Sequence, residues 1–114
     1  MKIGRLGVWA LVDCLTARAE AAFARDVEQW GYSALWMGEA LGRDVLVNAA
    51  WLLANTRTLV IASGIANIFA RDAMAMAAAR VQLNEQSGGR FLLGMGISHA
   101  PIVSGYAATS MKNQ

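Results

Sequence analysis

Several residue types that define common classes of protein are nearly missing from this sequence of 114 residues. It holds one cysteine, Cys14, one histidine, His99, and one proline, Pro101. A lone cysteine cannot form an internal disulfide, which indicates a reducing, cytoplasmic setting. A lone histidine far from that cysteine offers none of the ligand spacings of zinc sites, so we predict no metal centre.

Charge is also scarce, since 16% of the residues are charged and the net charge is +2. The ten basic residues are dispersed along the chain without a basic stripe, so we expect no nucleic acid as a partner. We expect no membrane partner either, because the longest uncharged stretch, residues 91–111, is interrupted by glycines, His99 and Pro101. The abundant residues are hydrophobic, at 56%, as in a protein that buries a core.

Short apolar segments alternate with helical patterns along the chain. Strands are predicted at residues 3–10, 33–37, 58–65 and 90–96, where apolar and β-branched residues are concentrated. Helices are predicted from Thr16 to about Trp30, from Val45 to about Asn55 after the capping residue Asp44, and from Asp72 to about Gln86. Gly31 follows the first of these helices, at the position where a left-handed residue is needed.

This order predicts a parallel sheet, because right-handed crossovers join strands that alternate with helices. The strands begin at intervals of about 29 residues, and eight such units approach the ~250 residues of a (β/α)8 barrel. We therefore predict an α/β fold, a parallel βαβαβαβ arrangement that forms the first half of a (β/α)8 TIM barrel. A doubly wound sheet is the competing architecture, and periodicity cannot separate the two.

The predicted strands and helices have more apolar surface than can be buried by packing three helices on one face of a sheet. Both faces of the predicted strands are apolar, as at Val60 and Ile61, and such strands need cover on both sides. The segment 45–55 is apolar around its whole circumference, which is typical of a helix buried on all sides. Deep packing in a larger fold and a subunit interface formed by helices 45–55 and 73–86 both satisfy this demand.

Polar and aromatic residues follow the predicted strands at the edge where parallel α/β folds bind ligands. They are Trp9, Glu39, Ser63, Asn67 and His99, which the topology gathers although they are distant in sequence. His99 and Glu39 each have a structural alternative, as a satisfied histidine and a solvated carboxylate. Ser63 with Gly64 interrupts a β-branched run and predicts a bulge or a close backbone approach.

Two glycines, Gly94 and Gly96, end the fourth predicted strand. They do not complete a dinucleotide-binding fingerprint, because His99 stands where the third glycine is required and no helix start follows. Small residues at this place instead allow a loop or a ligand to approach the strand end closely.

Three segments together resemble the luciferase-like monooxygenase superfamily of flavin and deazaflavin oxidoreductases. They are Gly-Tyr-Ser-Ala-Leu-Trp-Met-Gly-Glu at 31–39, Ala-Ser-Gly-Ile-Ala-Asn-Ile-Phe-Ala-Arg-Asp at 62–72 and Ser-Gly-Gly-Arg-Phe-Leu-Leu-Gly-Met-Gly-Ile-Ser-His at 87–99. The combination of Gly-Ile-Ala-Asn-Ile with Ser-His-Ala-Pro is similar to the group that uses the deazaflavin coenzyme F-420. The resemblance runs from Lys2 to about Tyr106, which predicts a partial barrel domain at 1–106 and a divergent tail at 107–114.

The resemblance implies a cofactor ring at the carboxyl ends of the strands. Gly64 and Ile65 match a bulge behind the ring, which in several members contains a cis peptide bond, and Asn67 matches a position that lines the ring. The cofactor-binding residues that we expect are Ser63, Gly64, Ile65, Asn67, Gly96 and Ser98, with Glu39 and His99 as catalytic residues and Trp9 in the substrate pocket. Many members carry histidine after the glutamate, but Ala40 and Leu41 follow Glu39 here, so this corner departs from the family pattern for a proton relay.

The function that the resemblance implies is hydride transfer between coenzyme F-420 and an unspecified small organic substrate, with FMN as the second choice of cofactor. The family holds the cofactor phosphate with loops after later strands, so we expect this chain to be a truncated, amino-terminal half. A catalytically silent half-barrel that self-associates and a small doubly wound binding module are the alternatives. Family dimers pack through the second and third helices, so a homodimer through helices 45–55 and 73–86 is also expected.

Overall fold

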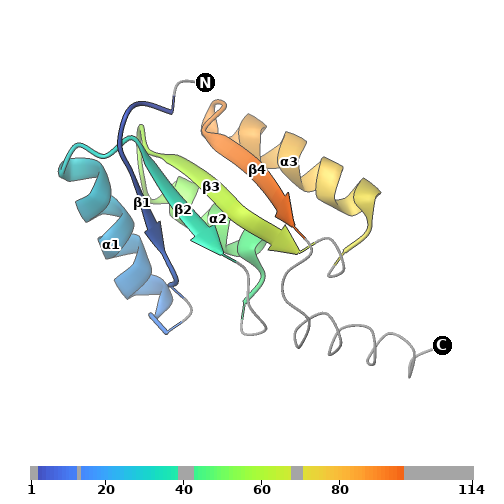
Figure 1. Cartoon of the computed structure of the whole chain (residues 1–114), viewed down its shortest axis with the longest axis horizontal. Coiled ribbons are helices and arrows are strands. Elements are labelled where there is room, and N and C mark those ends of the chain that lie inside the picture. Colours follow the sequence, from blue (N-terminus) through green and yellow to red (C-terminus); the bar gives the residue numbers. More distant parts are fainter. Residues whose placement is uncertain (1–2, 13, 39–42, 68–70, 97–114) are drawn as a thin grey trace.

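Residues 3–12, 14–38, 43–67 and 71–96 are described in a computed structural model of the chain, in which strands and helices alternate (Figure 1). The strands are β1 (Gly7–Ala10), β2 (Ala34–Gly38), β3 (Val60–Asn67) and β4 (Phe91–Gly96). The helices are α1 (Ala17–Gln29), α2 (Val45–Ala54) and α3 (Ala73–Ser87). The predicted order of elements is confirmed.

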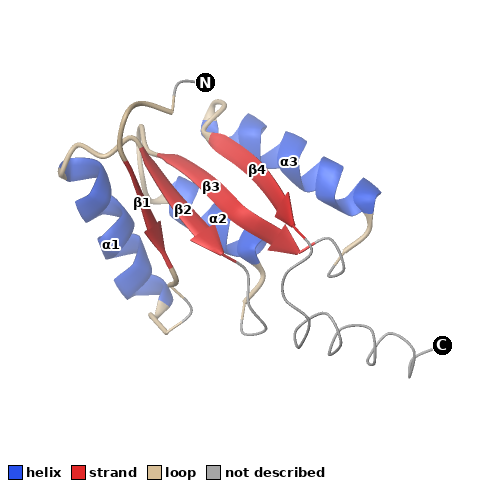
Figure 2. Ribbon diagram, in the orientation of Figure 1, coloured by secondary structure: helices blue, strands red, loops and turns tan. Residues whose placement is uncertain are grey.

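The four strands form one parallel sheet in the order β1-β2-β3-β4. Each strand therefore lies beside the next one in sequence, as in successive units of a (β/α)8 barrel and unlike the reversed order of a doubly wound sheet. All three helices contribute to a core on one face of the sheet. Figure 2 shows the other face toward the viewer, and no helix of the described residues crosses it.

Each helix begins at a residue whose side chain caps its first turn. The side-chain oxygens of Thr16, Asp44 and Asp72 accept hydrogen bonds from backbone N–H groups two or three residues further on, at 2.7 to 3.2 Å. α1 ends where Gly31 takes a φ of 92°, a conformation that residues with a β-carbon rarely adopt. These starts and this end agree with the sequence pattern.

All four strands begin later than the sequence predicts, β2 and β4 by one residue and β1 and β3 by more. β1 starts at Gly7 instead of Ile3, since Gly4 has a φ of 79° and takes the chain out of the extended conformation. β3 starts at Val60 instead of Thr58, because the backbone N–H groups before it donate to the carboxylate of Glu28 and not to a neighbouring strand.

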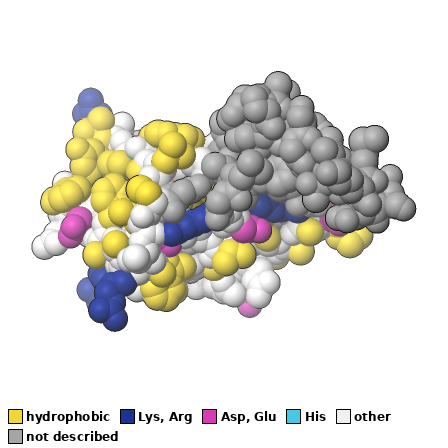
Figure 3. Space-filling view, turned by 90° about the horizontal axis from the view of Figure 1, so that it is seen from below, with side chains coloured by type: hydrophobic (Ala, Val, Ile, Leu, Met, Phe, Trp, Pro, Cys, Tyr) yellow, Lys and Arg dark blue, Asp and Glu magenta, His cyan; other side chains and the backbone are white. Residues whose placement is uncertain are grey.

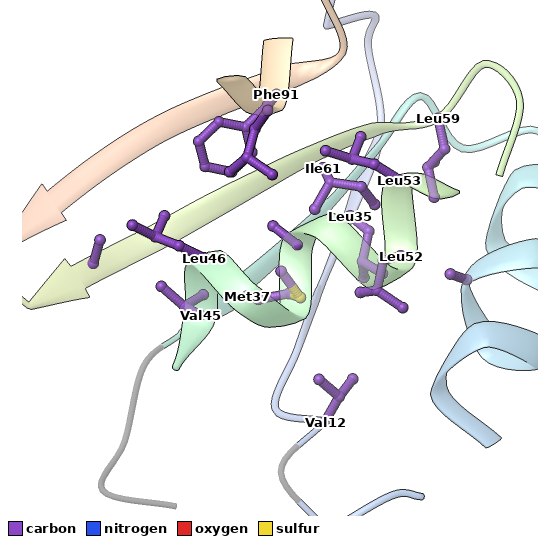
Figure 4. Packing of buried hydrophobic residues seen from close by; sticks show 14 of the residues in the cluster. Val12, Leu35, Met37, Val45, Leu46, Leu52, Leu53, Leu59, Ile61 and Phe91 are labelled. Atoms are coloured by element: carbon purple, nitrogen blue, oxygen red, sulfur yellow. The ribbon is translucent and has the colours of Figure 1, made fainter. Parts of the chain in front are cut away.

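The hydrophobic core lies between the sheet and the helices (Figure 4). Leu35 and Met37 of β2 and Ile61 of β3 are fully buried there, and they share a face because side chains alternate along a strand. Figure 4 shows them directed toward α2, which contributes Leu46 and Leu52. The core therefore fixes which strand residues remain on the opposite face.

The outer surfaces of α2 and α3 are exposed. Val47 of α2 is 70% exposed and Met74 of α3 is 83% exposed, and Trp51 and Val81 lie on the surface beside them. Within the described residues the sheet covers one side of the helix at 45–55 and the other side is open, so the larger fold or subunit interface expected to cover that side stays a prediction. None of the helices in the described part of the chain is long and apolar enough to cross a bilayer.

A single guanidinium group joins three elements at the amino-terminal end of the sheet. Arg90 donates to the carbonyl oxygens of Leu53 at 2.9 Å, Thr56 at 3.2 Å and Leu59 at 2.9 Å, and also to the Thr56 hydroxyl at 3.0 Å. Its Nε donates to the carbonyl of Ser87 at 3.0 Å. The planar fork of arginine thus satisfies backbone acceptors at the end of α2, before β3 and after α3.

We expect Arg90→Lys to lower the free energy of unfolding by about 2–4 kcal/mol, because a lysine cannot reach these acceptors together and leaves partly buried carbonyls unsatisfied. Urea unfolding measures the change. Arg80→Lys, at an exposed position on α3, is the matched control and should stay within about 0.5 kcal/mol of the wild type. Equal losses at the two positions would contradict the role of Arg90.

Glu28 fixes the other side of the same end of the sheet. Its Oε2 accepts from the backbone N–H groups of Arg57, Thr58 and Leu59 at 2.7 to 2.9 Å, and from the Thr58 hydroxyl at 3.2 Å. Partial burial alone raises the pKa of the Glu28 carboxyl, but these hydrogen bonds to the ionised form outweigh burial and hold the pKa below its usual value.

A lowered pKa in the folded state means that the ionised Glu28 stabilises the fold above the pKa of an unfolded glutamate, ~4.3, and that this contribution is lost as the pH falls through the folded pKa. We expect Glu28→Gln to cost about 1–2 kcal/mol at pH 7 and progressively less below about pH 4. Urea unfolding across this range tests it, with Glu85→Gln on the exposed side of α3 as the control. A loss for Glu28→Gln that does not change with pH would refute the assignment.

Candidate functional site at the carboxyl edge of the sheet

The face of the sheet without helices carries a row of side chains across its middle. Trp9, Trp36, Ala62 and Leu92 are cross-strand neighbours in register, one from each strand. They alternate with the residues that form the core, so they lie on the opposite face. Trp9 is 54% exposed, and the row therefore presents an aromatic surface at one side of the sheet.

Nearer the carboxyl end, two adjacent strands have glycine, Gly38 on β2 and Gly64 on β3, and we call this pair the glycine floor. A β-carbon at Gly64 would lie within 3.0 Å of Cε3, Cζ3 and Cη2 of Trp9. A β-carbon at Gly38 would lie 3.3 Å from Cζ2 of the same indole. The benzene half of the Trp9 side chain therefore rests on the glycine floor, reaching from β1 across β2 to β3.

The sheet is interrupted beside this floor. The pairing of β3 with β4 shifts register between Ser63 and Ala66, which confirms the bulge predicted from Ser63 and Gly64. The fully buried hydroxyl of Ser63 closes the gap, since it accepts from the N–H of Gly94 and donates to the carbonyl of Gly94, both at 2.9 Å. Gly94 is required here because a β-carbon would overlap the Ser63 carbonyl oxygen.

The structure places part of the predicted site. Trp9, Ser63, Gly64 and Gly96 lie on β1, β3 and β4, and Trp9 contacts Gly64 directly. Ile65 and Asn67 continue the backbone of β3, paired with Gly38 and Gly96 respectively. Glu39, Ser98 and His99 lie outside the described residues.

Two details differ from the sequence-based expectation. The described residues contain no cis peptide bond, so the one that several family members have at the bulge is not observed here. Gly38 is a site residue that the sequence prediction does not include. It lies two positions after Trp36 on the same face of β2, and this alternation is the signal that could identify it.

Paired charges tie the beginnings of the helices together at the same edge. Arg43 donates to Glu20, which is almost fully buried, at 2.8 Å and also to the carbonyl of Leu15, while Arg71 lies 3.3 Å from Asp44. A hollow of about 330 Å³ is lined here by Ala17, Glu20, Arg43, Asp44, Val47, Asn48 and Trp51. Figure 3 views the molecule from the side to which the strands point and shows basic and acidic side chains next to each other between hydrophobic areas.

Residues 5–112 match the family model of the luciferase-like monooxygenases. The chain therefore belongs to the luciferase-like monooxygenase family, as its three segments predict. It is 30% identical over 107 residues to a protein of Mycobacterium tuberculosis whose name describes it as a coenzyme F-420-dependent oxidoreductase, covering 93% of this chain and 30% of that protein. It is 35% identical over 77 residues to the 5,10-methylenetetrahydromethanopterin reductase of Methanolobus tindarius, covering 67% of this chain and 24% of that enzyme.

A solved structure supports the fold. The coenzyme F-420-dependent tetrahydromethanopterin reductase of Methanopyrus kandleri superposes with a TM-score of 0.81 at 20% sequence identity, over 90% of this chain and 29% of that one. The four strands and three helices thus have the arrangement found in that reductase. The chain spans less than a third of the length of each of these three proteins.

Removal of the Ser63 hydroxyl tests the bulge. We expect Ser63→Ala to lower the free energy of unfolding by about 1–3 kcal/mol, because the N–H and the carbonyl of Gly94 both lose their partner. Ser33→Ala is the matched control, since the Ser33 hydroxyl makes no hydrogen bond to another described residue, and it should stay within about 0.5 kcal/mol of the wild type. The interpretation fails if urea unfolding gives the same loss for both variants.

Proposed function

We propose that this chain forms part of the cofactor site of a luciferase-like oxidoreductase, which transfers a hydride between coenzyme F-420 and a small organic substrate. The observation that carries the proposal is the glycine floor with the exposed indole of Trp9 at the carboxyl edge of the sheet. This surface is apolar and aromatic, because the Trp9 indole lies over glycines of two adjacent strands, and an aromatic surface suits the tricyclic ring of a deazaflavin. The names of the relatives, which include coenzyme F-420, support the choice of cofactor.

The predicted site residues would have different roles in binding the cofactor and the substrate. The bulge at Gly64 and Ile65, with Asn67, Gly96 and Ser98, would surround the ring, and Ser63 would hold the bulge in place through its bonds to Gly94. Trp9 would form one wall of the substrate pocket. Glu39 and His99 would hold or move a proton near the reacting atoms, since carboxylate and imidazole are the usual acid–base groups. The bound deazaflavin itself supplies the redox chemistry by accepting or donating the hydride.

FMN is the second choice, because flavins carry the same shape of ring. The division into a barrel domain at 1–106 and a tail at 107–114, and a cytoplasmic location suggested by the single Cys14, remain part of the proposal. A homodimer through 45–55 and 73–86 is supported by the apolar surface that α2 and α3 expose at Val47, Trp51, Met74 and Val81.

A different class of function has two observations in its favour. The chain spans 24% to 30% of its curated relatives, and one face of its sheet has no cover among the described residues. A catalytically silent half-barrel that buries this face by self-association would have these properties as well.

Sedimentation equilibrium with a cofactor titration separates the two. We expect the protein that carries this sequence to bind coenzyme F-420 at least about tenfold more tightly than FMN, a difference of about 1.4 kcal/mol. We also expect the mass of a dimer, which the double variant Val47→Asp, Val81→Asp converts to a monomer. Tighter binding of FMN would reverse the choice of cofactor, and an associated protein that binds neither would favour the silent half-barrel.

A further inference from the structure

We infer, on the basis of the proposed function, that the cofactor ring stacks on the outer face of the Trp9 indole, and that Gly64 lacks a side chain in order to seat this indole. A glycine behind a cofactor is usually explained by contact between the backbone and the cofactor. Here the space in front of Gly64 is already filled by the protein itself.

The first support is the fit between the indole and the glycine floor. Three ring atoms of Trp9 lie where a side chain at Gly64 would begin, and two more contacts of its ring lie over Gly38. A ring that approached Gly64 from the open face would have to displace this indole. The surface actually offered at the floor is therefore aromatic, and an aromatic side chain prefers to stack on another π-system.

The second support is that the same device occurs twice on this face. The neighbouring indole, Trp36, lies against Gly7, where a β-carbon would be 3.1 Å from Nε1 and 3.2 Å from Cδ1. Glycines on adjacent strands thus seat both indoles. Trp36 is the more buried of the two and Trp9 keeps half of its surface exposed, so Trp9 is the one positioned to meet a ligand.

The third support is that packing, and not a hydrogen bond, fixes the exposed Trp9 indole. The Trp9 N–H makes no hydrogen bond to any described residue, so no polar contact holds the ring in its place. Its position over the glycine floor is therefore set by packing, before any ligand is bound. Such a preformed aromatic surface binds a flat ring without the cost of ordering a mobile side chain. It should serve deazaflavin and flavin rings equally, so Trp9 adds affinity without choosing between them.

A double-mutant cycle between Trp9 and Gly64 tests the inference. The dissociation constant of coenzyme F-420 is measured by titration for the wild type, Trp9→Leu, Gly64→Ala and the double variant. We expect Trp9→Leu to weaken binding by about 10- to 100-fold, and Trp9→Phe to recover most of it. Gly64→Ala should weaken binding in the wild type, where it unseats the indole, and have little further effect in the Trp9→Leu background. Trp30→Leu is the control, since Trp30 is 65% exposed beyond the end of α1, and it should leave the dissociation constant unchanged.

The outcomes are distinguishable. Equal effects of Gly64→Ala in both backgrounds would show that the ring contacts Gly64 itself and would overturn the inference while the proposed function stands. If the folded wild type binds neither coenzyme F-420 nor FMN, the proposed function is overturned, and the inference with it. As a measurement less dependent on the stability of variants, protein labelled with 5-fluorotryptophan should show a shift of the Trp9 resonance on addition of coenzyme F-420 and none for Trp30. An unshifted Trp9 resonance in a protein that binds the cofactor would also overturn the inference.

Discussion

Two hydrogen bonds between the Ser63 hydroxyl and the backbone of Gly94 hold β3 and β4 together at the place where their pairing changes register. Without a partner for these backbone groups the bulge would leave polar atoms unsatisfied inside the sheet. The bulge in turn sets where Gly64 lies, and Gly64 is the seat of the Trp9 indole. The candidate site therefore depends on one buried hydroxyl that is itself turned away from the open face of the sheet.

The amino-terminal and carboxyl ends of the sheet differ in the residues that they carry. At the amino-terminal end, Arg90 and Glu28 satisfy backbone groups of the turns and fix where β3 begins. At the carboxyl end β2 and β4 finish in glycine, and the exposed surface is aromatic. This division is the one expected of a (β/α)8 barrel, in which one face supplies stability and the other carries the site. It lets the carboxyl edge change without loss of the fold.

Local patterns were sufficient to predict much of the fold. The caps at Thr16, Asp44 and Asp72 and the alternation of strands and helices depend on residues close in sequence, and they were found correctly. The start of β3 could not be found in this way, because it depends on the carboxylate of Glu28, which lies on α1 and is distant in sequence. The glycine floor could not be found in this way either. The Trp9 indole from β1 fills the space over Gly64 on β3, and no local pattern connects Trp9 with Gly64. The composition of α2 predicts that its outer side is covered, but composition does not identify what covers it, and the described residues leave that side open.

The open face of the sheet connects the fold to the proposed function, since the surface that the described residues leave uncovered is also the one that carries Trp9 and the glycine floor. The most direct test of this connection is a crystal structure of the protein with coenzyme F-420 bound. We expect the ring at the carboxyl edge of β1 to β4, stacked against the face of Trp9 that points away from Gly64. A ring bound elsewhere on the protein, or one that lies on Gly64 with Trp9 displaced, would contradict the role given to this surface.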